Sequence, residues 1–151
     1  MGEYVKASGR FGLVRLYDPV TAITAREGAW RPRAVALARE VLPDGGTVLD
    51  IGAGTGLFTR LFADAVGENG RVVAVDISQK FLDHIATSGH EAGLKNFDTV
   101  LCTADSTELP IASVDVAFIC DTYHHFEFPL KTLTSLRQAL KPNGRVIVID
   151  F

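Results

Sequence analysis

The chain has 151 residues, 47% of them hydrophobic, and a formal net charge of −3 at pH 7, which suits one domain with a buried core and leaves no room for a second. Its 15 Lys and Arg residues are scattered rather than clustered, which disfavours binding to a nucleic-acid backbone. No apolar run approaches the roughly 18 residues of a membrane span and the N-terminus is not of signal type, so we expect a soluble, cytoplasmic protein without a membrane partner.

Short β-branched runs alternate with longer segments of helical periodicity, a pattern typical of βαβ units around a parallel sheet. Ahead of the sheet, Pro32 is expected to begin a helix that ends at Pro43–Gly46. Ser78 is the expected N-cap of a later helix. The expected strands are Thr47–Ile51, Arg71–Asp76, Phe97–Thr103, Val114–Cys120 and Arg145–Phe151. The expected helices between them are Gly56–Val66, Ser78–Ala92 and Pro129–Leu140.

The first strand runs directly into a glycine-rich turn, Gly52-Ala53-Gly54-Thr55-Gly56. Three glycines separated by single residues let the backbone turn sharply and approach a ligand closely. Asp76 ends the second strand, 20 residues after the turn, where a carboxylate can accept both hydroxyls of a ribose. The pattern predicts a site for an adenosine-containing cofactor at the end of a parallel strand.

Two other nucleotide motifs fit this turn poorly. A dinucleotide-binding G-x-G-x-x-G motif would need a glycine where Leu57 stands, and a P-loop would need Lys followed by Ser or Thr, whereas the chain continues Leu57-Phe58-Thr59-Arg60. Asp50, two residues before the turn, would repel a pyrophosphate but suits an ammonium or sulfonium group. Charge therefore favours a nucleoside that carries a cationic amino acid.

With these residues in place, the chain resembles the class I S-adenosylmethionine-dependent methyltransferases from about Trp30 to its last residue. Within them it is most similar to the type 11 small-molecule enzymes, such as those of quinone biosynthesis. The resemblance implies that residues 1–151 form one methyltransferase domain, with residues 1–30 as a cap over the cofactor. It implies an α/β, Rossmann-like, doubly wound sheet of five parallel strands in the order 3-2-1-4-5, with helices on both faces. The family's final helix and two strands have no counterpart in this sequence.

The same resemblance implies S-adenosyl-L-methionine as cofactor, S-adenosyl-L-homocysteine as product and a small-molecule methyl acceptor. Asp76 would bind the ribose, Ile77 would pack on the adenine, and Asp105, beside Ser106, would contact the adenine amino group. Asp121 and Thr122 would lie near the methionine portion. The expected cofactor-binding residues are Asp50, Gly52, Ala53, Gly54, Thr55, Gly56, Asp76, Ile77, Asp105, Ser106, Asp121 and Thr122.

The candidate catalytic residues are Tyr123, His124 and His125, which follow the fourth strand, where open α/β sheets place their ligand crevice. In an extended segment neighbouring side chains point to opposite sides, so we expect one histidine at most to face the transferred methyl group. That imidazole would act as general base. The alternative is that one histidine bonds to the backbone and the other packs. Tyr123 would line the acceptor pocket, and no metal site is expected.

Cys102 and Cys120 are expected to be free thiols, because the implied strand order separates them by roughly 14 Å, twice the Cα distance of about 7 Å that a disulfide allows. Arsenic methyltransferases, which need several thiols at the site, are set aside because neither cysteine is expected at the ligand end of a strand. Asp115 is expected to be structural, either as a solvated turn residue or as a partner for backbone amides at the strand entrance.

The last expected strand, Arg145–Phe151, would leave a long apolar edge with unpaired backbone groups. This edge predicts a homodimer, or a chain that is part of a longer protein. Two functions remain open: methyl transfer to a small-molecule acceptor by in-line displacement, and a cofactor-binding module without catalysis. A nicotinamide-binding domain is a distant third.

Overall fold

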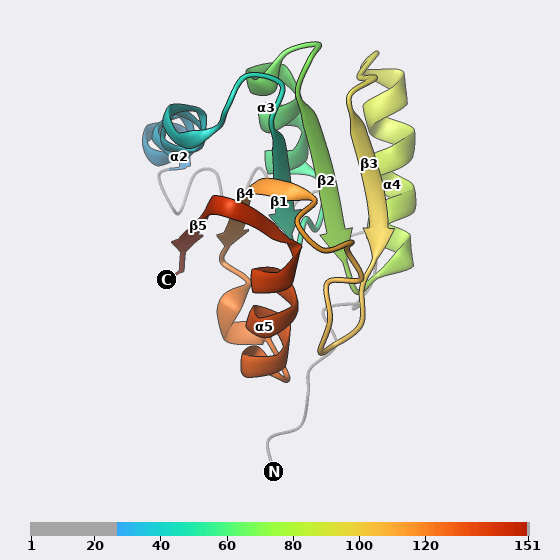
Figure 1. Ribbon diagram of the computed structural model, residues 1–151. Coiled ribbons are helices and arrows are strands. Elements are labelled where there is room, and N and C mark those ends of the chain that lie inside the picture. Colours follow the sequence, from blue (N-terminus) through green and yellow to red (C-terminus); the bar gives the residue numbers. More distant parts are fainter. Residues whose placement is uncertain (1–26, 151) are drawn as a thin grey trace.

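Five parallel strands form the sheet of the computed structural model, which describes residues 27–150 (Figure 1). The strands lie in the order β3-β2-β1-β4-β5, which confirms the expected order. All four neighbouring pairs are parallel. The central strands are almost continuous apolar runs because both of their faces are covered. The strands are β1 (Thr47–Ile51), β2 (Arg71–Asp76), β3 (Phe97–Leu101), β4 (Val114–Cys120) and β5 (Leu140–Ile149).

Helices cover both faces of the sheet, as expected. The alternation of side chains along β2 shows the two layers: Val72 and Ala74 pack towards α2, α3 and α4, whereas Val73 and Val75 pack with α5. Figure 1 shows α5 on the opposite side of the sheet from α3. Within residues 27–150, no helix combines the length and apolar character needed to cross a membrane. The helices are α2 (Glu27–Val41), α3 (Leu57–Val66), α4 (Gln79–Glu91), the 3₁₀ helix η1 (Tyr123–His125) and α5 (Pro129–Ala139).

The start of α2 differs from the sequence prediction. The helix begins at Glu27, so Pro32 lies inside it rather than at its first turn. An interior proline costs about 3 kcal/mol, and tertiary packing offsets that cost. Trp30 stacks on Phe58 with ring centroids 5.8 Å apart, and Ala38 is fully buried. Residues 1–26 lie outside the described residues, so the N-terminal cap stays a prediction.

The last strand also begins earlier than expected. β5 starts at Leu140, which pairs with Val114, and the register then shifts so that Arg145 pairs with Val116. This irregularity contains the Pro142–Gly144 turn, which the sequence pattern had placed between helix and strand. Phe151 lies outside the described residues.

The end of β3 and the capping contact of α4 differ from the sequence prediction for local reasons. β3 ends at Leu101 instead of Thr103, because the backbone N–H of Thr103 donates to the carbonyl of Ser106 and the chain turns there. Ser78 does occupy the N-cap position of α4, but its hydroxyl makes no capping hydrogen bond. Its backbone N–H instead donates to Asp76 Oδ1 at 2.8 Å. The helix start is thereby joined to the end of β2.

Asp115 has the structural role expected of it. Its Oδ2 accepts hydrogen bonds from the backbone N–H of Thr47 at 2.8 Å and from Lys141 Nζ at 2.7 Å. These contacts join β1, β4 and β5 at their amino ends, away from the carboxyl ends where open α/β sheets bind ligands. The residue therefore contributes to stability rather than to the site.

We expect Asp115→Ala to lower the free energy of unfolding by about 1–3 kcal/mol, because it removes the acceptor of the Thr47 amide. Urea denaturation measures this loss, and cofactor affinity should be unchanged. The matched control is Asp98→Ala, which removes an exposed carboxylate paired with Arg71 and should cost less than about 1 kcal/mol. Equal losses in the two variants would contradict the role assigned to Asp115.

Candidate cofactor and active site

The glycine-rich turn after β1 is joined to the end of β2 by backbone hydrogen bonds. The N–H groups of Gly52 and Ala53 both donate to the carbonyl of Val75, at 2.8 and 3.1 Å. The next glycine, Gly54, donates its N–H to Asp76 Oδ2 at 2.9 Å. β1 lies between β2 and β4, at the point where the strand order reverses, and open α/β sheets bind ligands at that point.

The three glycines have different neighbours, although all have positive φ angles of 53–79°. A Cβ atom at Gly52 would lie 2.2 Å from Cγ2 of Thr122, and one at Gly56 would lie 2.7 Å from Cγ1 of Ile85. At Gly54 the nearest atom to such a Cβ is the Gly52 carbonyl oxygen, 3.9 Å away. Protein packing therefore accounts for the outer two glycines. The middle one is half-buried and a Cβ atom there would meet no close packing, so a ligand can approach its backbone.

Asp76 lies next to Gly54 at the end of β2. Its side chain is buried, its Oδ1 accepts from the Ser78 amide and its Oδ2 accepts from the Gly54 amide. A carboxylate has about four lone-pair positions, so two remain for the hydroxyls of a ribose. Burial raises the pKa of Asp76, and the backbone amide donors oppose that rise. Ile77, the next residue, is half exposed and offers an apolar surface where the adenine is predicted to pack.

Asp50 is a buried carboxylate under the same turn. It is 3% exposed, and its Oδ2 accepts a hydrogen bond from the Thr59 hydroxyl at 2.7 Å. Burial raises its pKa to about 6, and the negative charge of Asp76 adds to the rise. A cationic ligand group would relieve this unfavourable charge. The pair of buried acids therefore fits the sugar and the ammonium or sulfonium group of S-adenosylmethionine.

The loop after β4 lies against the glycine-rich turn. Asp121 leaves the strand with a positive φ of 50°, and its N–H donates to the carbonyl of Ile149 at the end of β5. The side chain of Thr122 covers the Cα of Gly52, and its hydroxyl donates to the carbonyl of Cys120 at 2.8 Å. The turn after β1 and the loop after β4 thus meet, as the sequence prediction requires. The contacts of Asp121 and Thr122 with the methionine portion stay a prediction.

The two candidate histidines do not lie in an extended segment. Tyr123–His125 form a 3₁₀ turn, in which the N–H of His125 donates to the carbonyl of Thr122 at 2.9 Å. The rings of His124 and His125 lie side by side, with centroids 4.0 Å apart, and both are exposed. The expectation that they point to opposite sides was wrong, because it assumed a strand-like backbone. Tyr123 is also exposed, and its ring packs edge-on against Phe126.

The sequence analysis did not identify one residue at the carboxyl edge of the sheet. Asp150 follows β5 directly, and its Oδ1 lies 2.8 Å from Nδ1 of His124. Asp121 Oδ1 lies 4.0 Å from the same nitrogen. The signal was present in the sequence, because an acid directly after a parallel strand belongs to the same edge as the other site residues.

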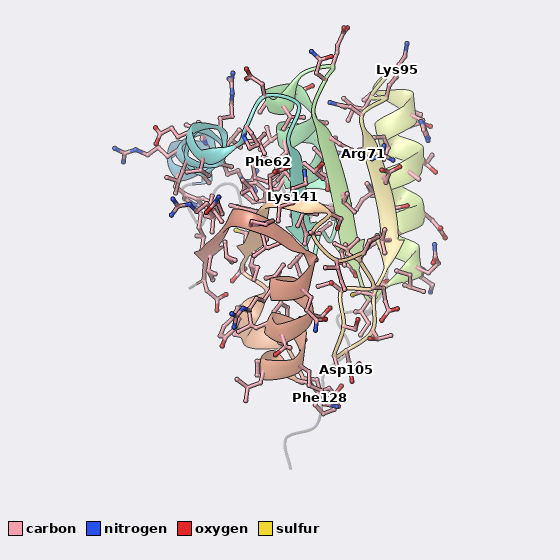
Figure 2. All side chains as sticks on the ribbon, in the orientation of Figure 1. Phe62, Arg71, Lys95, Asp105, Phe128 and Lys141 are labelled. Carbon is pink, nitrogen blue, oxygen red and sulfur yellow. The ribbon has the colours of Figure 1, made fainter. Side chains whose placement is uncertain are left out.

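Asp105 and Ser106 are bonded to α5 in this structure. Asp105 accepts from the Thr103 hydroxyl at 3.0 Å and from Lys131 Nζ at 3.3 Å, and these donors lower its pKa. The Ser106 hydroxyl lies 3.4 Å from Oγ of Ser135. Figure 2 shows Asp105 next to Phe128, at the start of α5. The predicted contact of Asp105 with the adenine stays a prediction.

A hollow of about 340 Å³ lies beside α5 rather than at the glycine-rich turn. It is wide open, and none of its lining residues belongs to the glycine-rich turn. The hollow is lined by Ser106, Leu130, Lys131, Thr134, Ser135 and Gln138.

Both cysteines are free, as expected. Their places were wrongly predicted: Cys120 is the last residue of β4 and Cys102 directly follows β3, so both lie at the ligand end of a strand. Burial raises the pKa of Cys102 to about 11 and that of Cys120 to about 12. The thiolate is the nucleophile and metal ligand, so these thiols are inert near neutral pH. Thiol-dependent methylation is disfavoured by protonation rather than by position.

A parallel sheet in the order 3-2-1-4-5, with a glycine-rich turn after β1 and an acid ending β2, defines the class I methyltransferase type of Rossmann-like domain. The comparisons with known proteins agree. A family model described as a methyltransferase domain matches residues 49–148. The chain therefore belongs to the S-adenosylmethionine-dependent methyltransferase family, type 11.

Among curated proteins, the chain is similar to the ubiquinone/menaquinone biosynthesis C-methyltransferase UbiE of Burkholderia mallei. The two are 32% identical over 127 residues, which are 82% of this chain and 49% of the relative. The UbiE of Burkholderia pseudomallei matches equally well. The chain thus spans about half the length of the curated relatives it matches.

Two solved structures share the fold. A SAM-dependent methyltransferase from Aquifex aeolicus aligns with a TM-score of 0.73 and 31% identity, covering 78% of this chain and 63% of that one. The YcgJ protein from Bacillus subtilis aligns with a TM-score of 0.69 and 26% identity, covering 78% of this chain and 50% of that one.

Proposed function

We propose that this chain binds S-adenosylmethionine at the turn after β1 and directs its methyl group to a small organic acceptor by in-line displacement. The observation that carries the proposal is that two buried carboxylates, Asp76 and Asp50, lie at the glycine-rich turn, where the N–H of Gly54 donates to Asp76. This set of groups suits a molecule with a diol at one end and a cation at the other.

Each residue of the site is proposed to contact one part of the cofactor. Asp76 accepts the ribose hydroxyls, Ile77 and Asp105 contact the adenine, and Asp50 faces the cationic amino-acid end. Gly52–Gly56 supply the backbone wall, with Asp121 and Thr122 closing the methionine side. S-adenosylmethionine, when bound, supplies a methyl group already activated on sulfur. Orientation of the reactants contributes about 7–11 kcal/mol, so the protein's main task is to align them and exclude water.

The acceptor is proposed to approach over the loop after β4. Tyr123 and Phe126 pack edge-on there with ring centroids 5.6 Å apart, next to the exposed imidazoles of His124 and His125. Aromatic walls and a proton acceptor suit a small aromatic compound that carries a hydroxyl group. The curated relatives are named as quinone-biosynthesis C-methyltransferases, which supports an aromatic acceptor, although their name gives carbon as the methylated atom.

A non-catalytic module that binds S-adenosylmethionine or S-adenosylhomocysteine is the second candidate. It is favoured by the exposure of the acceptor side, where the side chains of Tyr123 and His124 are 39% and 41% exposed. Catalysis of methyl transfer needs water to be excluded, and these side chains face solvent in the described part of the chain.

Calorimetry with S-adenosylmethionine, S-adenosylhomocysteine and NAD tests cofactor binding. We expect the first two to bind. We expect NAD not to bind, because Leu57 stands where the dinucleotide motif needs its third glycine. Release of S-adenosylhomocysteine in the presence of a library of small phenols then separates the enzyme from the binding module. Binding of NAD alone would refute both candidates, whereas cofactor binding without release would favour the module.

We further propose that two copies of the chain pair through the outer edge of β5. In the described residues this edge has no neighbouring strand, and Val146 and Val148 on it are 44% and 51% exposed. Exposed apolar edges favour pairing with a second chain. Light scattering should give twice the mass of the chain, and Val148→Lys should restore the monomer. A monomer in the unsubstituted protein would exclude this dimer.

A further inference from the structure

We propose that Asp150 is a positioning residue for His124: it holds the imidazole in the tautomer that makes Nε2 a proton acceptor for the hydroxyl of the methyl acceptor. The inference deepens the proposed methyl transfer and rests on it. It concerns an acid directly after β5 that has no place among the expected cofactor contacts.

The contact between the two residues is short and is fixed by the backbone. Asp150 Oδ1 lies 2.8 Å from His124 Nδ1, although the residues are 26 positions apart. The strand ends that carry them are joined, because the N–H of Asp121 donates to the carbonyl of Ile149 at 2.8 Å. The Asp150 side chain is 25% exposed and that of His124 is 41% exposed. β4 and β5 therefore present the pair as a unit.

The chemistry of the pair follows from which imidazole nitrogen carries the proton. A carboxylate accepts a hydrogen bond, so Asp150 selects the form with hydrogen on Nδ1 and a lone pair on Nε2. Nε2 can then take the hydroxyl proton while the acceptor oxygen bonds to the methyl carbon and the carbon–sulfur bond breaks with its electron pair going to sulfur. The resulting imidazolium is stabilised by the negative charge of Asp150, and it returns the proton to water.

A divalent cation is the competing reading of the same cluster. Asp121, His124 and Asp150 each offer a ligand atom, and these atoms lie within 4.8 Å of one another. A metal would use Nδ1 as its ligand and would therefore need that nitrogen without its proton. The 2.8 Å contact has the geometry of a hydrogen bond between Nδ1 and a carboxylate. Two ligand atoms that each lie about 2.1 Å from one metal ion are also about 3–4 Å apart, so a titration with the metal separates the two readings.

The tautomer can be measured directly in the unliganded full chain by ¹⁵N NMR of the imidazole nitrogens. His124→Gln assigns the His124 signals by removing them. We expect the Nδ1–H form in the unsubstituted protein and its loss in Asp150→Ala. Asp150→Asn, whose amide oxygen can still accept the hydrogen bond, should keep the tautomer. Asp64→Ala, at an exposed position near the end of α3, is the matched control and should change nothing.

Turnover of a hydroxyl acceptor provides the second readout. Asp150→Ala should lower kcat by about 10- to 100-fold with the dissociation constant of S-adenosylmethionine unchanged, and Asp150→Asn should lie between the two proteins because it orients the ring without the charge. An unchanged tautomer in Asp150→Ala would overturn the proposal. A shift of the His124 signals on adding micromolar Mn²⁺ or Zn²⁺ would overturn it in favour of a metal site.

These outcomes stay separate from the fate of the proposed function. If S-adenosylmethionine fails to bind the unsubstituted chain, the proposed function fails while the tautomer result still reports on the pair. If the cofactor binds and Asp150→Ala alters neither tautomer nor kcat, only the positioning role fails.

Discussion

Asp76→Ala is expected to weaken the binding of S-adenosylmethionine by at least 100-fold in calorimetry. The substitution removes an ionised acceptor from two ribose hydroxyls, and hydrogen bonds to charged groups contribute about 1.5–3 kcal/mol each. Two of them correspond to a factor of about 10² to 10⁴ in affinity. The loss should be larger still because Gly54, whose N–H now donates to Asp76, would be released from the end of β2.

Asp76→Asn separates these two contributions. Its amide oxygen can keep the hydrogen bond from Gly54, while its NH₂ group can accept neither the Ser78 N–H nor a ribose hydroxyl. We expect an affinity and a melting temperature that both lie between those of Asp76→Ala and the unsubstituted protein. Asp98→Asn, on the neighbouring strand but away from the turn, should bind normally. Near-normal affinity in Asp76→Ala would show that the ribose does not bind at the end of β2.

The strand order and the glycine-rich turn could be predicted because they depend on local signals that a parallel sheet constrains strongly. Runs such as residues 72–75, at the centre of β2, are apolar throughout, which is typical of a doubly covered strand. The turn needs positive φ angles at Gly52, Gly54 and Gly56, and glycine is the residue that adopts them most readily, so the residue type predicts the turn. The role of Asp115 was likewise readable from its place at a strand entrance.

The remainder depends on contacts between residues far apart in the chain. The start of α2 was misplaced because stacking of Trp30 on Phe58 outweighs the local signal of Pro32. The histidine pair was misoriented because the 3₁₀ turn depends on how the loop closes over the glycine-rich turn. The partner of His124 follows a different strand, so no local pattern joins the two residues.

The two carboxylates under the turn differ in what they cost the fold. Asp76 accepts from the backbone amides of its own loop and of Gly54, whereas Asp50 is almost completely buried and accepts from the hydroxyl and backbone N–H of Thr59. A buried charge with so little compensation destabilises the folded state, and such strain is typical of functional sites. The retention of an acid at position 50 is therefore explained by the cation it would meet in the occupied site rather than by stability.

We therefore expect Asp50→Asn to raise the free energy of unfolding and to lower the affinity for S-adenosylmethionine. The folded pKa of Asp50 is about 6, above the ordinary value of 3.8, so between these values the folded state binds more protons than the unfolded state. Stability is lost as the pH rises through this window, and the full cost, about 2–3 kcal/mol, applies at pH 7. The amide removes that cost and still accepts from the Thr59 hydroxyl. Urea denaturation should show the gain at pH 7 and little gain near pH 4.

The same variant should bind S-adenosylmethionine at least tenfold more weakly at pH 7, because the neutral amide gives up the attraction between a carboxylate and the cationic end of the ligand. In the unsubstituted protein the affinity should fall as the pH drops below about 6, where Asp50 becomes protonated, and Asp50→Asn should lack this dependence. If Asp50→Asn is more stable but binds S-adenosylmethionine as tightly as the unsubstituted protein above and below pH 6, the cationic end of the ligand does not bind at Asp50. Because stability and affinity move in opposite directions, general damage to the fold cannot produce the expected result.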